Sequence, residues 1–377
     1  MRMSKSKRVL MPLCAAVLAS VATASYALPI YTITDLGTLG GPGSNAYGIN
    51  DAGQVVGAST TSSIGDSHAF LYSGGGMTDL GTLGGRFSIA ESINNAGQVV
   101  GVSAISSYFP SHAFLYSGGS MADLGTLGGM YSRASGINDA GQVVGESATA
   151  GNAAQHPFLY SGGSMIDLGT LGGTNGSAYS INDAGQIVGG SSTTGDIAQH
   201  AFLYSGGMTD LGTLGGTDSW AMGINNAGQV AGASYISGDA AYHAFVYSGG
   251  SMTDLGTLGG TYSQAAGINN IGQVVGYSNI TGDTSIRAFL YDAGNLLDLN
   301  ALAAAQDSGW TLDYASGINN NGQITGYGSI GGQVHAYLLT PTAAAVPEPP
   351  AAMLLLVGAL GLIGIRRGRK PLNKGGA

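Results

Sequence analysis

Seven copies of one unit of 44 residues constrain the fold of this chain more than any other feature. Each copy carries the dipeptide Asp-Leu, which recurs at steps of 44 residues with one step of 43 and starts at Asp35, Asp79, Asp123, Asp167, Asp210, Asp254 and Asp298. A second mark, usually Ile-Asn-(Asp/Asn)-Ala-Gly-Gln, recurs at the same steps apart from a longer last step of 50 residues. Its asparagines are Asn50, Asn94, Asn138, Asn182, Asn225, Asn269 and Asn319. Repeats of this kind bury their apolar surfaces against neighbouring copies, so the chain is predicted to form a repeat architecture.

Each copy contains four short runs that are typical of β-strands. In the first complete copy the first strand ends over Tyr47–Asn50, and the others cover Gln54–Ser59, His68–Ser73 and Met77–Gly81. The Asp-Ala-Gly turn between the first two strands suits a tight hairpin, because glycine accepts the positive φ that closes it. Four antiparallel strands per copy is the pattern of a β-propeller blade. The sequence therefore predicts an all-β, seven-bladed β-propeller, with an open β-solenoid as the alternative.

The two ends of the repeat region are complementary. The last copy supplies only three strands and ends with His335–Thr340, whereas Ile30–Leu36 precedes the first copy and has no blade of its own. Pairing these segments would complete the last blade and remove an exposed sheet edge. We therefore expect the N-terminal strand to pair with the last blade and close the ring.

Segments of different composition flank the repeats. Four basic residues and an apolar stretch from Val9 to Ala22 predict a secretory signal peptide over residues 1–27, with a signal anchor as the rival interpretation. The propeller is predicted over residues 28–340, and a Pro/Ala linker over 341–350. An apolar run and a basic tail over residues 351–370 predict a transmembrane segment whose basic end stays in the cytoplasm.

The C-terminal segment resembles the PEP-CTERM sorting tail of Gram-negative bacteria, in which a Pro-Glu-Pro motif, an apolar helix and an arginine cluster follow one another. The matching residues are Pro347, Glu348, Pro349, Arg366 and Arg367. The resemblance implies that a membrane exosortase recognises the motif and processes the tail. It also implies an association with exopolysaccharide.

The repeats resemble the HAF extracellular repeat family, named for the His-Ala-Phe that begins at His68, His112, His200 and His243. Copies depart from this motif at Pro157, Arg287 and Tyr337, which weakens any function that needs equivalent sites on every blade. The resemblance implies an extracellular location and brings no established chemistry.

Charge and cysteine content limit the partners. Residues 28–345 carry 20 acidic and 3 basic residues, a formal charge of −17, so a phosphate backbone would be repelled and nucleic acid is excluded as a partner. Cations, neutral glycans and basic proteins remain as alternatives. The sole cysteine, Cys14, lies in the predicted signal peptide, so we expect no disulfide in the mature chain.

Repeated polar residues are predicted to be structural. All six histidines occupy the same place in the third strand, where equivalent positions on adjacent blades are too far apart to share one metal ion. We expect them to be buried donors that fasten a blade or loop, and the aspartate of Asp-Leu-Gly to be an acceptor at a turn or strand end. Gly-Asp pairs at Asp66, Asp196, Asp239 and Asp283 predict simple turns, with a calcium ion as the alternative.

Variable residues offer the only candidate ligand site. The position before the strand alanine holds Asn45, Ile89, Arg133, Ser177, Trp220, Gln264 and Tyr314, and nearby positions add Tyr262, Trp310 and Asp313. We expect these residues on the rim of the channel, where aromatic and polar side chains could stack on sugars or hold a peptide. Ordinary loop variation is the alternative. The predicted binding residues are Arg133, Trp220, Tyr262, Trp310 and Tyr314.

Together these features predict an exported, surface-anchored or matrix-associated protein that binds glycan or protein and is not an enzyme. A glycosidase or lyase would need paired carboxylates near the channel, and the off-template acids there are Glu91 and Asp313. A purely structural surface spacer is the third alternative. No nucleophile motif, metal box or phosphate loop is recognisable.

Overall fold

The structure is a computed structural model that describes residues 30–63, 65–301 and 308–342. These residues belong to one compact unit, Ile30–Ala343. Over them the chain is all-β, with three short 3-10 helices at Ala150–Asn152 (η1), Thr281–Asp283 (η2) and Leu299–Ala301 (η3). None of the helices in the described part is long and apolar enough to cross a membrane. The predicted signal peptide and transmembrane segment lie outside the described residues.

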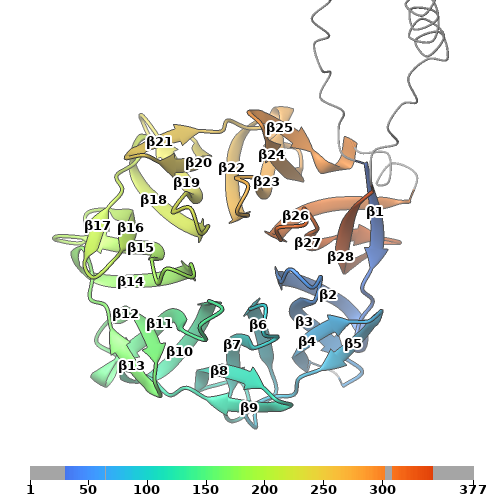
Figure 1. Ribbon diagram of the computed structural model, residues 1–377, viewed down its shortest axis with the longest axis horizontal. Coiled ribbons are helices and arrows are strands. Elements are labelled where there is room, and N and C mark those ends of the chain that lie inside the picture. The colour runs from blue at the N-terminus through green and yellow to red at the C-terminus, as the bar shows by residue number, and fades with distance from the viewer. Residues whose placement is uncertain (1–29, 64, 302–307, 343–377) are drawn as a thin grey trace, which may run out of the picture. The chain divides into compact units, whose positions relative to one another are not determined.

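The strands pair in groups of four around a common centre, with the first strand of each group innermost (Figure 1). A parallel bridge, with Tyr131 opposite Ser111, also links two neighbouring groups. The first three groups are β2 (Gly40–Ile49), β3 (Val55–Thr61), β4 (Ser67–Ser73) and β5 (Gly76–Asp79); β6 (Ser88–Ile93), β7 (Val99–Ala104), β8 (Ser111–Ser117) and β9 (Ser120–Asp123); β10 (Gly128–Ile137), β11 (Val143–Thr149), β12 (Gln155–Ser161) and β13 (Ser164–Asp167). The next three are β14 (Gly172–Ile181), β15 (Ile187–Thr193), β16 (Gln199–Tyr204) and β17 (Met208–Asp210); β18 (Gly215–Ile224), β19 (Val230–Ile236), β20 (Tyr242–Ser248) and β21 (Ser251–Asp254); β22 (Gly259–Ile268), β23 (Val274–Ile280), β24 (Ile286–Asp292) and β25 (Asn295–Asp298). The last group combines β26 (Trp310–Ile318), β27 (Ile324–Ile330) and β28 (Gln333–Thr342) with β1 (Ile30–Asp35).

The expected partner of the N-terminal strand is present. β1 pairs antiparallel with β28, with Ile30 opposite Thr342 and Asp35 opposite Tyr337. The backbone N–H of Leu36 continues the ladder by donating to the carbonyl of Ala336 at 3.0 Å. The two ends of the described unit are therefore joined in one sheet.

Strand direction gives the molecule two distinct ends. Because strands within a group are antiparallel, the turns after the first and third strands lie at one end, here called the turn end. It includes residues 50–54 and 74–75 and their equivalents. The loops after the second and fourth strands, such as residues 105–110 and 80–85, lie at the opposite end, here called the loop end.

Glycine is required where the two inner strands of a group approach each other. A Cβ atom added at Gly145 would lie 1.9 Å from the carbonyl oxygen of Arg133, and the equivalent glycines of the other groups have the same close approach. The register of β10 and β11 shifts beside this contact, between Ala134 and Gly136. Such a β-bulge bends a strand without ending its pairing.

The core lies between neighbouring groups. Val55 and Phe70 are fully buried and form one cluster with Ala46 of their own group and with Ala336 and Leu338 of the group that precedes them around the ring. Equivalent clusters recur at the other junctions. Both faces of each sheet are thus covered, which fits strands that do not alternate between apolar and polar residues. Four-stranded sheets that pack side by side around an axis form a β-propeller.

Candidate functional site

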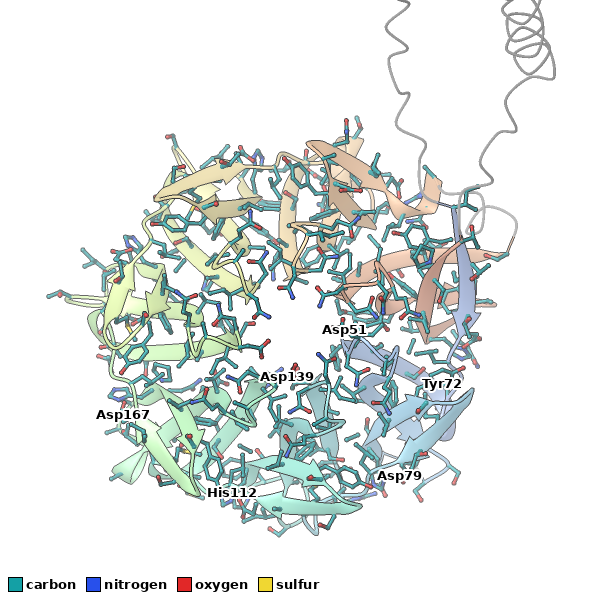
Figure 2. All side chains as sticks on the ribbon, viewed as in Figure 1. Asp51, Tyr72, Asp79, His112, Asp139 and Asp167 are labelled. Carbon is teal, nitrogen blue, oxygen red and sulfur yellow. The ribbon has the colours of Figure 1, made fainter. Side chains whose placement is uncertain are left out.

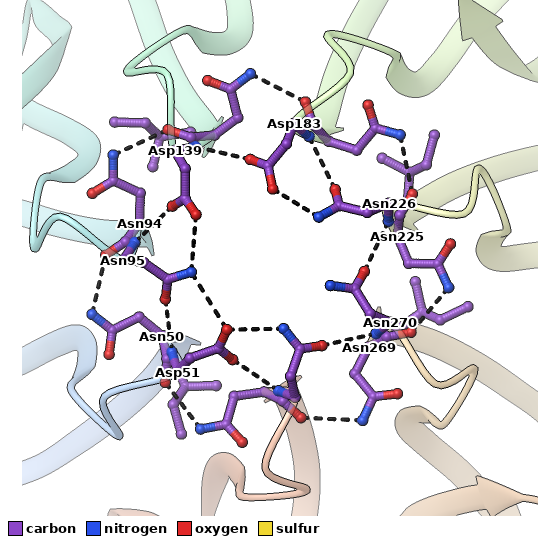
Figure 3. A pocket seen from close by; sticks show the side chains of 18 of the residues that line it. Asn50, Asp51, Asn94, Asn95, Asp139, Asp183, Asn225, Asn226, Asn269 and Asn270 are labelled. Atoms are coloured by element: carbon purple, nitrogen blue, oxygen red, sulfur yellow. Dashed lines mark hydrogen bonds between the residues drawn. The ribbon is translucent and has the colours of Figure 1, made fainter.

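A ring of asparagines joins the groups at the turn end. Asn50 donates from Nδ2 to the carbonyl of Asn94 at 3.0 Å, and its Oδ1 accepts the N–H of Gln54. The same bond passes from each repeat to the next, and Asn319 donates to the carbonyl of Asn50 at 2.9 Å (Figure 3). The members of this Asn ring are 3–4% exposed; they are Asn50, Asn94, Asn138, Asn182, Asn225, Asn269 and Asn319.

The Asn ring surrounds a polar pocket of about 440 Å³ at the mouth of the channel. The next residue of each repeat also lines it and is Asp51, Asn95, Asp139, Asp183, Asn226, Asn270 or Asn320. Each of these side chains accepts the backbone N–H of the equivalent residue in the neighbouring repeat; for example, the backbone N–H of Asn95 donates to Asp139 Oδ1 at 2.9 Å. Because the polar groups satisfy their neighbours, this pocket fastens the repeats together. Within the described residues, no group of three His, Cys, Asp or Glu side chains could hold a metal ion.

The histidines fasten the outer strands, as predicted. His112 Nδ1 lies 2.8 Å from Asp123 Oδ2, while Oδ1 of this aspartate accepts the N–H of Gly125. Figure 2 shows His112 at the periphery and Asp51 and Asp139 at the centre. The same pair occurs at every histidine, although these side chains are 17–24% exposed and so only partly buried. Arg287 takes the place of histidine in one copy and lies 3.6 Å from Asp298.

The Gly-Asp pairs form turns whose carboxylates hold the neighbouring loop. Asp283 has a positive φ of 52° and accepts hydrogen bonds from the backbone N–H and the hydroxyl of Thr261. These bonds lower the pKa of Asp283 below its usual value. Asp196 makes the same contacts with Thr174, whereas Asp66 accepts from Nε of Arg86 at 2.7 Å. The turn interpretation is confirmed.

The variable position before the strand alanine lies inside a strand, between neighbouring groups, and not on an open rim. Trp220 on β18 donates from Nε1 to Gln199 Oε1 on β16 at 2.6 Å. Ser177 on β14 donates to Glu146 on β11. The predicted placement in a rim loop was therefore wrong for this position, because its residue lies within a strand and packs against the preceding group, although Trp220 and Tyr314 stay partly exposed.

Trp310 also lies where the prediction did not place it. It begins β26, is 7% exposed and packs edge-on against the ring of Tyr337 in a core cluster. A side chain so buried cannot contribute a surface for a ligand. Sequence position alone placed it in a long entry loop, since six neighbouring residues that precede it carry no strand pattern.

An aromatic series runs from the loop end toward the channel on one side of the ring. Adjacent members of the series have ring centroids 4.6–6.3 Å apart. The one exception is the step from Tyr242 to Tyr277, whose hydroxyl oxygens lie 3.5 Å apart. The members are partly buried, and they are Trp220, Tyr235, Tyr242, Tyr262, Tyr277, Tyr314, Tyr327 and Tyr47. Tyr262 and Tyr242 lie near the loop end, whereas Tyr47 lines the channel. Of the predicted binding residues, the series contains Trp220, Tyr262 and Tyr314.

A polar cluster occupies the opposite side of the ring. Arg133 Nη2 lies 2.6 Å from Glu91 Oε1, and Glu146 accepts from the hydroxyls of Tyr131 and Ser177. Burial raises the pKa of Glu91, and the guanidinium of Arg133 opposes this shift. Arg133 therefore pairs with a largely buried carboxylate, while its own side chain is 41% exposed. This cluster was not predicted as a unit, because its members come from three different repeats.

The two off-template acids are not brought together. Glu91 lies on β6 and Asp313 on β26, and β2 lies between these strands around the ring (Figure 1). Burial raises the pKa of Asp313, which accepts a hydrogen bond from Ser329 at 3.4 Å. Glu91 and Asp313 are therefore two separate carboxylates and do not form a flanking pair of the kind that glycoside hydrolysis uses.

Comparison with known proteins supports the fold alone. The sequence matches no protein-family model and no curated protein. The chain is similar to the β-propeller domain of the Trilobed protease from Pyrococcus furiosus, which is described as having an open velcro topology. The TM-score is 0.53 at 9% sequence identity, and the alignment covers 85% of this chain and 100% of that domain. TolB from Acinetobacter baumannii aligns with a TM-score of 0.45 and 12% identity over 81% of this chain and 65% of its own. The resemblance to the HAF and PEP-CTERM families stays a prediction.

Proposed function

We propose that this chain is a seven-bladed β-propeller, closed by β1, that binds glycan on the aromatic series and has no enzymatic activity. The observation that carries the proposal is the series itself, because rings with polar edges stack on the apolar faces of sugars while their hydroxyls bond sugar hydroxyls. A surface with a net charge of −17 in residues 28–345 does not favour an anionic partner. Exopolysaccharide of the producing cell is the expected ligand class.

Retention on exopolysaccharide tests this function. The purified chain is mixed with exopolysaccharide from the producing cells, with and without calcium, and the supernatant is assayed for new sugar ends. Saturable retention without cleavage supports a binding propeller. Absence of retention favours the alternative of a purely structural spacer or a protein-binding role.

We further propose that the chain is exported and held at the cell surface or in the matrix after sorting through its C-terminal tail. Pro347, Glu348, Pro349, Arg366 and Arg367, which carry the resemblance to exosortase substrates, lie outside the described residues. Glu348→Gln should slow processing by the exosortase and leave an unprocessed chain in the inner membrane. Cell fractionation and the mass of the mature protein measure this outcome.

A polysaccharide-degrading enzyme is the alternative function, and Glu91 is the residue that favours it. Its carboxyl is buried beside Arg133 and has a raised pKa, as a general acid requires. New sugar ends in the retention assay that disappear in Glu91→Gln would support this alternative. Sugar ends that persist in this variant would count against it.

A further inference from the structure

We infer that the ligand of the aromatic series is an uncharged polysaccharide, a neutral hexose polymer in preference to a polymer of uronic acids. The inference rests on the proposed function, since it names the ligand class of the same site. It follows from where the few cations of the molecule are placed.

Every basic side chain of the repeat region faces a carboxylate. Arg86 Nε lies 2.7 Å from Asp66, Arg133 Nη2 lies 2.6 Å from Glu91, and Arg287 Nη1 lies 3.6 Å from Asp298. Residues 28–345 contain no other arginine and no lysine. Binding of a uronate carboxylate usually needs a guanidinium or ammonium group, because burying an unpaired charge is costly. Here each guanidinium already faces a carboxylate, so a uronate would have to share it with that carboxylate; Nε of Arg133 and Nε of Arg287 have no hydrogen-bond partner among the described residues.

The surroundings of the aromatic series repel anions further. The series contains no basic residue. The pKa of Tyr314 is raised, first by burial and second by the negative charge of the adjacent Asp313. Across the channel, Glu91 and Glu146 outnumber Arg133. A polymer with a carboxylate on its sugars would therefore approach a negative field on both sides of the channel.

The groups that remain suit hydroxyl-rich, neutral sugars. Aromatic rings present apolar faces, and the side-chain oxygens beside them are acceptors, such as Gln199 Oε1 next to Trp220 and Gln264 Oε1 next to Tyr277. Sugar hydroxyls both donate and accept, so they can bond tyrosine hydroxyls and amide oxygens without any charge. Affinity for such a ligand should depend little on salt.

The inference is tested by measuring binding of the full purified chain to three soluble polymers of similar length. They are a neutral glucan, an anionic polygalacturonate and a cationic chitosan, each at low and high salt. We expect the glucan to bind at both salt concentrations and the polygalacturonate to bind at least about tenfold more weakly, equivalent to about 1.4 kcal/mol. Uronate binding that is lost in Arg133→Gln overturns the inference, although not the proposed glycan function. The inference is also overturned if chitosan is the only polymer that binds and high salt abolishes this binding.

Two tyrosine variants locate the site. Tyr242→Ala should weaken glucan binding about tenfold or more, since its ring contacts two members of the series. Tyr262→Ala serves the same purpose if Tyr242→Ala does not fold, because its ring contacts only Tyr242 within the series. Tyr108→Ala is the control, as Tyr108 is a 47% exposed tyrosine outside the series. Equal loss in the control places binding elsewhere. Retention of none of the three polymers removes the inference, whereas the proposed function is decided by retention on exopolysaccharide from the producing cells.

Discussion

Individual residues differ between repeats because each must fit the neighbouring group. Trp220 is accommodated because the facing position of the preceding group is Gly190, where an added Cβ would lie 2.8 Å from Trp220 Cδ1. At the equivalent junction of the last two groups, Tyr277 faces Tyr314 with centroids 4.9 Å apart. The variation that looked like a candidate binding rim is therefore partly a matter of complementary packing.

Gly190→Ala tests this complementarity. Because the new methyl group would collide with the Trp220 ring, we expect the free energy of unfolding to fall by about 1–3 kcal/mol, the usual effect of overpacking. Urea denaturation followed by tryptophan fluorescence measures the change. Gly207→Ala is the matched control, since nothing lies within 4 Å of its Cβ position, and it should change stability by less than about 0.5 kcal/mol. Equal effects of the two substitutions would contradict the packing argument.

Acid should weaken the loop contact of Asp283. Its folded-state pKa is lowered, mainly because the Thr261 hydroxyl donates to the carboxylate, so the contact stabilises the protein above the unfolded pKa of about 3.9. This contribution is lost as the pH falls through the lower, folded-state value. We expect the free energy of unfolding of Asp283→Asn to fall less steeply than that of the parent chain as the pH is lowered through this range. Denaturation at a series of pH values measures it. Thr261→Val removes the same donor and should behave alike; an unchanged profile in both variants would refute the assignment.

Among the elements, the turns after the inner strands join neighbouring repeats as well as reversing the chain. Asn138 donates to Gln142 Oε1 and to the carbonyl of Asn182 and accepts the N–H of Gln142. One side chain thus satisfies a turn and bonds the next group. A single repeat predicts the turn, but the bond between repeats needs the neighbouring copy in place.

Removal of one member of the Asn ring should therefore be costly. Asn138→Ala leaves buried partners without hydrogen bonds, and we expect a loss of about 2 kcal/mol in the free energy of unfolding. Chemical denaturation of the variant measures it. Ala140→Ser, at an exposed position of the same turn, is the control and should be neutral. A neutral Asn138→Ala would mean that the ring does not fasten the repeats.

Sequence periodicity predicted the strands better than their contacts. The third strand was expected at His68–Ser73 and is observed at Ser67–Ser73, because its alternating aromatic and aliphatic residues mark it clearly. For the first strand only the end over Tyr47–Asn50 was predicted. The strand begins at Gly40, where its glycine-rich part has no strand pattern and is held by pairing with Thr61. The aromatic series and the Glu91–Arg133 pair were not predicted, because their members meet only after the repeats pack.

On the scale of the whole molecule, both ends of the described unit lie at the turn end. Ile30 begins β1 opposite Thr342, the last residue of β28, and β28 runs from the loop end to the turn end. Tyr242 and Tyr262 lie near the opposite end, the loop end, so the two ends of the unit and this part of the aromatic series are on different sides of the ring.

The joining of the two ends in one sheet should also determine stability. The outer neighbour of β28 is β1, which lies more than 300 residues earlier in the chain. β1 also provides Asp35, whose carboxylate contacts the ring of His335. Without residues 30–35, β28 would present an unpaired edge, which favours local opening and aggregation. The equivalent strand β12 keeps its own neighbour β13 and its own pair of His156 and Asp167, so it serves as an internal control.

Hydrogen exchange of a chain lacking residues 30–35 provides the measurement. We expect amide protection in β28 to fall by at least about tenfold relative to the intact chain, which corresponds to about 1.4 kcal/mol of local stability, while protection in β12 changes much less. An equal fall in both strands would mean that β1 stabilises the molecule as a single cooperative unit. Unchanged protection in β28 would show that the Asn ring and the inner strands alone hold the last group in place, and that pairing with β1 is dispensable for closure.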